Sequence, residues 1–275
     1  RGKYFKDSYM PKKQSTITLI TDFGLQDGYV GVMKGVISNI NPSASVIDIS
    51  NTIAAQDIFQ AACVLNNSYN YFPKGTIHVV VVDPGVGSDR KILCLKTEDY
   101  VFLAPDNGVL SFVIEKDESP SIREVTNGKL FLPRLSNTFH GRDIFAPVAA
   151  HISKGVSHKE FGERVDKTNE ITLPKPILSP EGKLTAEIIY VDSFGNLITN
   201  VNKEVVDRMK IGTEKVSITM GRRRINGICS SYTDVGENEA LAIFGSSGYL
   251  EISVNLGNAG KVLKLKKGDK LILGS

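Results

Sequence analysis

The sequence has no tryptophan, only three cysteines and no long apolar run among its 275 residues. Cys63, Cys94 and Cys229 are odd in number, far apart and set among apolar residues. That pattern is typical of reduced core cysteines and argues against a disulfide framework or a cysteine metal site, so we expect a cytoplasmic protein. A helix that crosses a bilayer needs about 18 or more consecutive apolar residues. No segment approaches that length, so we expect no membrane partner.

The chain also lacks a large excess of either charge. Its 33 lysines and arginines oppose 30 aspartates and glutamates, and the excess of +3 is spread along the sequence. A net charge this small gives no reason to expect a nucleic-acid partner held by phosphate contacts. With 41% hydrophobic residues, the composition excludes intrinsic disorder and collagen-like repeats and supplies one large core or two modest ones.

The first half of the sequence alternates strand-like apolar runs with helical patterns, which is typical of an α/β sandwich. Three runs predict buried strands: Thr16–Thr21, 46–49 and 76–82. Two stretches with helical spacing predict helices: 29–40 and 57–71. The β-branched residues of the third run are typical of a central parallel strand that is buried on both faces. We therefore predict an α/β domain over residues 1–165, with an open, mainly parallel sheet between helices.

The pattern changes near Glu163. Polar, proline-containing sequence over residues 166–182 predicts an extended linker. Beyond it, short alternating runs are separated by Gly, Asn, Ser and Asp turns, which predicts a small all-β barrel over residues 183–275. Six runs predict its strands: Leu184–Val191, 197–201, 216–220, Ala240–Phe244, Tyr249–Val254 and 261–265.

Chemically active side chains gather where the strands of the first half end. Asp22 and Asp27 follow the first strand, the segment from Asp83 to Arg90 follows the third, and His140 precedes an apolar helical stretch. Ligands of an open parallel sheet bind beyond the carboxyl ends of its strands, so these groups are candidates for one site. Each also has a structural alternative. Asp22 is equally typical of a turn or a helix cap, the Asp-Pro-Gly segment of a turn, and His140 of a structural histidine.

Six segments, in this order, carry a more specific pattern: TDFG at 21–24, VVDPGVGSDR at 81–90, APDNG at 104–108, FHGRDIFAP at 139–147, VDSFGN at 191–196 and SSGYLEISVN at 246–255. Together they resemble the adenosine-forming S-adenosylmethionine (SAM) hydrolases, also called SAM hydroxide adenosyltransferases, whose relatives include the SAM-dependent fluorinase and chlorinase. The resemblance implies an N-terminal α/β domain, a C-terminal β-barrel and a homotrimer. Its SAM sites lie between the N-terminal domain of one subunit and the C-terminal domain of the next. The implied reaction cleaves SAM with water into adenosine and L-methionine, with no cofactor and no metal.

The resemblance implies that Asp83, Arg90 and His140 form an Asp–Arg–His set that positions and activates water, with Asp83 also contacting SAM. The chemistry is consistent with these roles. Attack on the ribose 5′-carbon displaces neutral methionine from a sulfonium, so the leaving group needs no proton. Water is a weak nucleophile. A carboxylate, a guanidinium and an imidazole around a water molecule can orient it and stabilise its hydroxide-like character. Which member of the set takes the proton stays open.

The resemblance also implies the residues that bind SAM. Asp22 matches the aspartate that holds the ribose hydroxyls, Asn196 the asparagine that contacts adenine, and Asp192 the residue near the methionine ammonium. Four more residues fall in the segment that in relatives lines the adenosine and methionine portions: Ser246, Tyr249, Glu251 and Val254.

Three alternatives remain beside the hydrolase. A halogenase-like adenosyltransferase uses the same fold, although the carboxylate of Asp83 opposes a buried halide. A metal-dependent phosphohydrolase would use Asp22, Asp27 and Asp83 as oxygen ligands for Mg²⁺. A non-catalytic nucleoside- or SAM-binding module would bind through the same loops without turnover.

Overall fold

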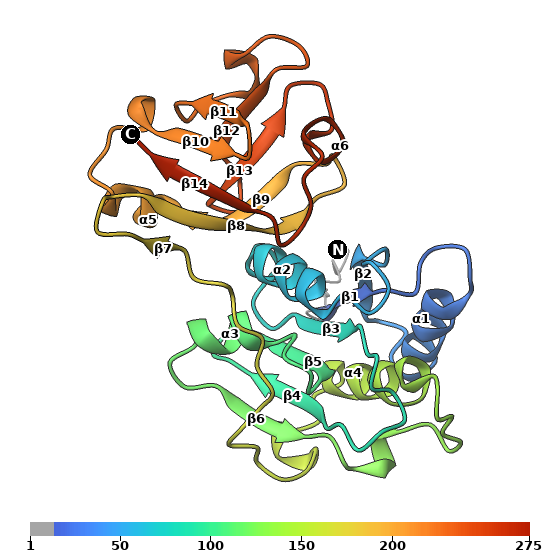
Figure 1. The fold of residues 1–275 in the computed structure, drawn as a ribbon. Coiled ribbons are helices and arrows are strands. Elements are labelled where there is room, and N and C mark those ends of the chain that lie inside the picture. The colour runs from blue at the N-terminus through green and yellow to red at the C-terminus, as the bar shows by residue number, and fades with distance from the viewer. Residues whose placement is uncertain (1–13) are drawn as a thin grey trace, which may run out of the picture. The chain divides into compact units, whose positions relative to one another are not determined.

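The computed structural model describes residues 14–275 (Figure 1). These residues divide into two compact units, the first ending at Ile171 and the second spanning Thr172–Ser275. The first thirteen residues of the predicted α/β domain lie outside the described part. Two backbone N–H groups of the predicted linker bond to the first unit, that of Asn169 to Asp106 Oδ1 at 2.8 Å and that of Ile171 to Ser111 Oγ at 2.9 Å. The beginning of the predicted linker, up to Ile171, is therefore hydrogen-bonded to the first unit.

The first unit contains a six-stranded sheet with the order β2-β1-β3-β5-β4-β6. Its strands are β1 (Thr16–Thr21), β2 (Ser45–Ser50), β3 (Ile77–Val81), β4 (Ile92–Lys96), β5 (Val101–Pro105) and β6 (Ser121–Glu124). Strands β2, β1, β3 and β5 are parallel, whereas β4 runs antiparallel to both β5 and β6. Every residue of β3 is buried, as predicted for a central parallel strand. The mainly parallel sheet is confirmed, with an antiparallel extension that the sequence patterns did not predict.

Helices cover both faces of this sheet: α1 (Tyr29–Ile40), α2 (Ile58–Ser68), α3 (Ser111–Lys116) and α4 (Ala146–Ser153) (Figure 1). On one face, Met33 of α1 and Val148 of α4 share a buried cluster with Ile17 and Val79 of the strands. The three- and four-residue spacing of apolar side chains in α1 places them on this face. Both predicted helices are confirmed, the second as α2 followed by a single 3₁₀ turn, Tyr69–Tyr71.

The second unit is a nearly closed antiparallel barrel with the strand order β11-β10-β14-β8-β9-β13-β12 and with β7 paired to β8. Its strands are β7 (Ile177–Leu178), β8 (Leu184–Val191), β9 (Leu197–Asn202), β10 (Ser217–Met220), β11 (Arg223–Asn226), β12 (Ala240–Phe244), β13 (Tyr249–Val254) and β14 (Lys270–Gly274). Just after the end strand β11, the N–H of Cys229 donates to the carbonyl of Ala242 in the other end strand, β12, at 2.7 Å. The predicted β-barrel is confirmed.

The predicted strand at 261–265 is wrong, because this segment contains the short helix α6 (Ala259–Leu263). The side chain of Asn258 accepts the N–H of Lys261 at 2.8 Å and caps the helix. Lys264, with φ of +56°, ends it in the left-handed conformation. Alternating lysines and aliphatic residues resemble a strand, but the local cap at Asn258 favours a helical turn.

Among the residues that the structure describes, no helix has the length and apolar content needed to cross a membrane.

Candidate active site

Arg90 connects the side chains of Asp83 and His140. Its Nε lies 2.9 Å from Oδ1 and 2.8 Å from Oδ2 of Asp83, and its Nη2 also donates to Oδ2. The same Nη2 lies 3.0 Å from Nδ1 of His140. The side chains of Asp83 and Arg90 are only 5% and 10% exposed. The structure therefore brings together the three predicted catalytic residues in one hydrogen-bonded set.

The loop that follows β3 places Asp83 and Arg90 side by side. The N–H of Val86 donates to the carbonyl of Asp83, and the hydroxyl of Ser88 donates to the carbonyl of Gly85 at 2.7 Å. The Asp-Pro-Gly segment is therefore a tight turn as well as part of the site. Gly87 has φ of +78°, and a Cβ there would lie 2.4 Å from the carbonyl oxygen of Asn137. Glycine is required at this position for the loop to approach the segment that carries His140.

His140 is held as a neutral imidazole. A guanidinium N–H can only donate, so Nδ1 of His140 accepts from Arg90 and the neutral ring carries its proton on Nε2. Burial lowers the pKa of His140, and the charge of Arg90 lowers it further, against weaker opposing effects of Asp83, Asp143 and a hydrogen bond with the Ser136 backbone. The ring is therefore held between Arg90 and the Ser136 backbone and adds no charge to the set.

A π-helical turn, η3 (Gly141–Phe145), follows His140 and leads into α4. π-turns inside helices frequently mark functional sites. A Cβ at Gly141 would lie 3.2 Å from Phe23, Met33 and Phe139, so this turn packs closely against the core. The rings of Phe23, Tyr29 and Phe139 are 5.0–5.7 Å apart, centre to centre. His140 therefore borders an aromatic cluster.

Asp143 is a buried residue of the site for which the sequence patterns predicted no role. Its carboxylate accepts N–H bonds from the Arg142 side chain, at 2.6 Å and 3.1 Å, and from the Ser136 backbone at 2.7 Å. Its backbone carbonyl accepts the N–H of Leu132 at 2.9 Å. Asp143 thus ties the segment before His140 to the turn after it. The only sequence signal was its place in the FHGRDIFAP segment.

Asp22 does not cap the helix that follows it. The N-terminal residue before α1 is Gly28, and no side chain caps that end. Oδ2 of Asp22 instead accepts the N–H of Gln56 at 2.8 Å, and Oδ1 takes part in no hydrogen bond within residues 14–275. Asp22 therefore keeps an oxygen for a ligand, and the helix-cap interpretation is wrong.

The aspartates of the phosphohydrolase alternative do not come together. Within residues 14–275, no group of three His, Cys, Asp or Glu side chains is placed to hold a metal ion. Asp27 is exposed, whereas Asp83 is engaged by Arg90. The donor set that this alternative requires is therefore not formed.

In the second unit, Asp192 positions Asn196. Oδ1 of Asp192 accepts the N–H groups of Phe194 and Asn196 at 2.9 Å and 2.8 Å, and Oδ2 accepts the Asn196 side-chain amide at 2.9 Å. Gly195 has φ of +88°, and a Cβ there would lie 2.1 Å from the side chain of Asn258. Both oxygens of Asp192 are therefore used within this turn, and the largely buried amide of Asn196 is fixed.

A cavity of about 620 Å³ lies beside this turn, entirely within the second unit. Asn196 and Val254, two of the predicted binding residues, line it together with Tyr232. Phe194 and Leu256, which also line it, are 75% and 79% exposed. Apolar side chains with a few fixed polar groups, here the amides of Asn196 and Asn258, are the usual composition of a small-molecule site. This combination suits a flat heteroaromatic ring.

The three other predicted binding residues of this unit lie in two places: Glu251 beside the cavity residue Tyr232, and Ser246 and Tyr249 at the turn that joins β12 to β13. Glu251 is buried, and its Oε2 accepts the hydroxyl of Tyr232 at 3.3 Å. Burial raises the pKa of Glu251, and the charge of Asp192 adds to this while the Tyr232 bond opposes it. Ser246 lies in the turn between β12 and β13, and Tyr249 begins β13. Neither of these two lines the cavity.

Comparison with known proteins places both units in one family. Residues 17–162 match the N-terminal domain, and residues 186–272 the C-terminal domain, of the SAM hydroxide adenosyltransferases. The chain is 35% identical to the (R)-S-adenosyl-L-methionine hydrolase of Methanocaldococcus jannaschii, over 98% of each protein. A fluorinase of an Actinoplanes species is more distant, with 24% identity over 92% of this chain and 95% of the fluorinase.

A solved structure has the same fold. The crystal structure of an uncharacterized conserved protein from Thermotoga maritima superimposes with a TM-score of 0.87 and 40% identity, over 94% of this chain and 100% of that one. The resemblance found in the six sequence segments is therefore confirmed, and the chain belongs to the SAM hydroxide adenosyltransferase family.

Proposed function

We propose that this protein hydrolyses SAM at the ribose 5′-carbon and releases adenosine and L-methionine. The observation that carries the proposal is the buried set in which Arg90 bonds to both Asp83 and His140. The family assignment and the hydrolase names of the relatives in the 33–35% identity range support the choice of substrate.

The proposed reaction is a direct displacement. The oxygen of one water attacks C5′, the C5′–S bond breaks, and its electron pair neutralises the sulfonium to give methionine. We assign the water's proton to Asp83. The lone pair on Nδ1 of His140 already accepts from Arg90, whereas a carboxylate has about four lone-pair positions and keeps one after three N–H contacts. Water that loses its proton to a buried carboxylate becomes the hydroxide-like nucleophile that the reaction needs.

The same contacts favour water over halide. An anion in this position needs N–H donors, and the Nε and Nη2 groups of Arg90 are already engaged by Asp83 and His140. The distant identity to fluorinases keeps the halogenase-like reaction as the second candidate.

The proposed binding mode uses both units. Asp22 accepts the ribose hydroxyls with its available oxygen, and the cavity beside Asn196 takes the adenine ring. Glu251 and Asp192 supply negative charge for the methionine ammonium, with Ser246 and Tyr249 completing this wall. We further propose a cytoplasmic homotrimer in which the first unit of one subunit meets the second unit of the next, because heterologous contacts close into a ring. SAM serves as substrate, with no additional cofactor.

The deciding experiment is hydrolysis in water enriched in oxygen-18. Each adenosine formed is expected to gain one labelled atom at its 5′-hydroxyl, whereas methionine gains none. Activity is expected to persist in EDTA, and saturating chloride is expected to yield no 5′-chloro product. Asp83→Asn, which keeps the shape but removes the basic oxygen, is expected to lower kcat by about 10²- to 10⁴-fold. Label in methionine, a chlorinated product or normal turnover of Asp83→Asn would each contradict the mechanism.

The proposed assembly has its own test. Light scattering is expected to give three times the mass of one chain, and mixing Asp83→Asn with Asn196→Ala subunits is expected to restore part of the activity. Restoration requires that one site takes these residues from different subunits. A fully active monomer would contradict the proposed trimer but not the proposed hydrolysis of SAM.

A further inference from the structure

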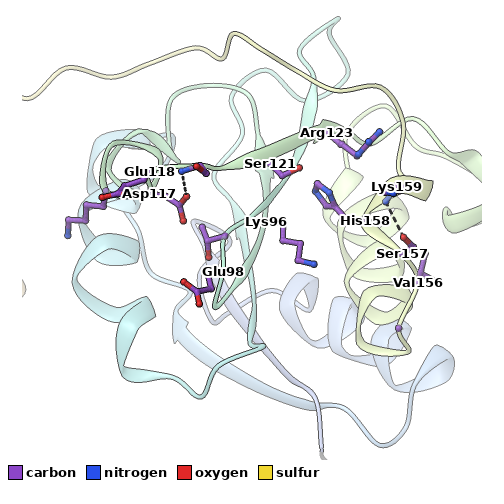
Figure 2. A pocket seen from close by; sticks show the side chains of 14 residues that line it. Lys96, Glu98, Asp117, Glu118, Ser121, Arg123, Val156, Ser157, His158 and Lys159 are labelled. Atoms are coloured by element: carbon purple, nitrogen blue, oxygen red, sulfur yellow. Dashed lines mark hydrogen bonds between the residues drawn. The ribbon is translucent and has the colours of Figure 1, made fainter.

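A second cavity, of about 1090 Å³, lies at the far end of the antiparallel strands of the first unit (Figure 2). It is lined by residues at the ends of β4 and α3, along β6 and after α4. Lys96 is the last residue of β4 and lies six positions after Arg90, which corresponds to about 20 Å of extended chain. None of the predicted site residues lines this cavity.

Four cationic or titratable side chains form one wall of this cavity: Lys96, Arg123, His158 and Lys159. We call them the cationic wall. In the sheet register, Cys94 pairs with Arg123 and Lys96 with Ser121, so Lys96 and Arg123 are diagonal neighbours on one face. Nε2 of His158 donates to the Cys94 carbonyl at 3.0 Å, which fixes the ring over the same strand and leaves Nδ1 for another partner.

The positive charge of this wall is not neutralised within the protein. In the part of the chain that the structure describes, no member of the cationic wall forms an ion pair. Arg123 donates to the neutral carbonyl of Gly162 at 2.7 Å. Burial lowers the pKa of His158, and the charges of Arg123 and Lys96 lower it further, while its bond to Cys94 opposes this. The uncompensated charges are thus near enough to influence one another.

Carboxylates lie on the other side of the cavity. Figure 2 shows Glu98, Asp117 and Glu118 toward one end and the cationic wall toward the other. An extended polyanion would place negative charge against these carboxylates, whereas a compact anion would not. The separation of charge therefore favours a small ligand over a nucleic acid.

We propose that the cationic wall is a binding site for a compact phosphate group, either inorganic phosphate or the phosphate of a small phosphomonoester. Arg123 offers two parallel N–H groups to two phosphate oxygens, Lys96 and Lys159 supply point charge, and the hydroxyls of Ser121 and Ser157 lie in the same lining. His158 donates from Nδ1 when it takes up a proton. The site is independent of the proposed SAM chemistry.

The test follows the ring signal of His158 by NMR, assigned with His158→Gln, while pH is varied with and without millimolar phosphate at constant ionic strength. Bound phosphate is expected to raise the pKa of His158 by roughly one unit, because a nearby opposite charge favours the imidazolium. Arg123→Gln and Lys96→Gln are each expected to weaken phosphate binding about tenfold. Lys116→Gln, which lines the same cavity beside Asp117, is the matched control and is expected to bind normally.

The titration is repeated with adenosine monophosphate and with adenosine. Tighter binding of the monophosphate identifies a phosphomonoester as the ligand, and equal binding identifies inorganic phosphate. An unmoved His158 signal with both phosphates would overturn the site, as would unchanged binding in Arg123→Gln. Because the readout is the His158 ring, failure here leaves the hydrolase proposal unaffected, and loss of hydrolysis leaves this site unaffected.

Discussion

Oδ2 of Asp143 accepts the backbone N–H of Ser136 across 2.7 Å, inside a turn where Asp143 has no exposed surface. Burial raises the pKa of this carboxyl, but the hydrogen bonds from Arg142 and Ser136 outweigh it and hold the pKa below its usual range. A buried charge that keeps its partners is rigid, since losing one partner is strongly unfavourable. This contact therefore fixes the segment from which His140 approaches Arg90.

We expect Asp143→Asn to lower kcat about 10- to 100-fold while KM for SAM changes little, because a displaced His140 no longer completes the catalytic set. Steady-state kinetics and the NMR signal of His140 check this together. Because the Asp143 charge itself raises the pKa of His140, a small lowering of that pKa is expected from loss of charge alone. A purely structural role would lower stability and leave kcat unchanged. The control is Asp166→Asn, whose ion pair with Arg164 is largely exposed. Normal kcat with an altered His140 signal would show that catalysis does not depend on the positioning of His140 by Asp143.

Asp22 is expected to recognise the nucleoside and not methionine. Asp22→Ala should weaken SAM and adenosine binding by about 10- to 100-fold, since a hydrogen bond to a charged group contributes roughly 1.5–3 kcal/mol. Asp22→Asn keeps an acceptor for Gln56 and so separates loss of charge from loss of the loop contact. Calorimetry with SAM, adenosine and methionine measures each effect, with the exposed Asp27→Ala as control. Unchanged adenosine affinity in both Asp22 variants would restrict Asp22 to a structural role.

The pH dependence of kcat/KM is expected to follow His140. Because burial and Arg90 hold its pKa below the ordinary value, the ring stays neutral through mildly acidic pH, and activity falls only as pH drops through that lowered pKa. In Arg90→Gln, the lost positive charge and the unpaired Asp83 both favour the imidazolium, so the His140 pKa should rise. NMR titration of both proteins checks the direction. A His140 pKa above the ordinary value in the unaltered protein would contradict this account.

His78 is expected to make stability fall in acid. Its ring is fully buried, accepts or donates one bond to Thr18 at 2.8 Å, and stacks on Phe102, and burial lowers its pKa to about 4. Between the unfolded value of about 6.5 and this folded value, the unfolded chain binds more protons. The free energy of unfolding should therefore drop as pH falls through this window, by up to about 3 kcal/mol from this residue.

The measurement is denaturant unfolding at several pH values, compared with His78→Phe. This variant keeps a ring among Tyr69, Phe72 and Tyr100 but cannot titrate. Its stability should therefore depend less on pH in the same window. Equal pH dependence of the two proteins would assign the acid effect to other titrating groups.

The spacing of apolar residues and the composition predicted two kinds of element correctly: strands that are buried on both faces and helices with one continuous apolar face. The strands at Thr16–Thr21 and Ile77–Val81 are buried on both faces and have continuous apolar runs, and α1 has a regular apolar stripe. The antiparallel pair Ile92–Lys96 and Val101–Pro105 was not predicted. Its two runs are joined by the short turn between Thr97 and Tyr100, where the βα alternation leads one to expect a helix.

The candidate site was predicted from motifs and not from packing. Local pattern does not bring together Arg90 and His140, which are 50 residues apart. Their contact depends on a long-range fit, in which Gly87 lets one loop rest on the Asn137 carbonyl. Asp143 was missed for the same reason. Its role depends on the hydrogen bond from the backbone N–H of Ser136, seven residues earlier, which sequence spacing does not reveal.

The bonding of Asp83 to Arg90 has a consequence for how the charge of the substrate is handled. One carboxylate, one guanidinium and one neutral imidazole sum to zero, so the catalytic set offers a cationic sulfonium no net attraction at long range. An uncharged nucleoside meets the same balanced surroundings. In the proposed binding mode, preference for the charged molecule then comes from carboxylates outside this set, those of Asp22 and of the second unit. Added salt should accordingly weaken the capture of SAM while leaving the rate of the bound complex almost unchanged.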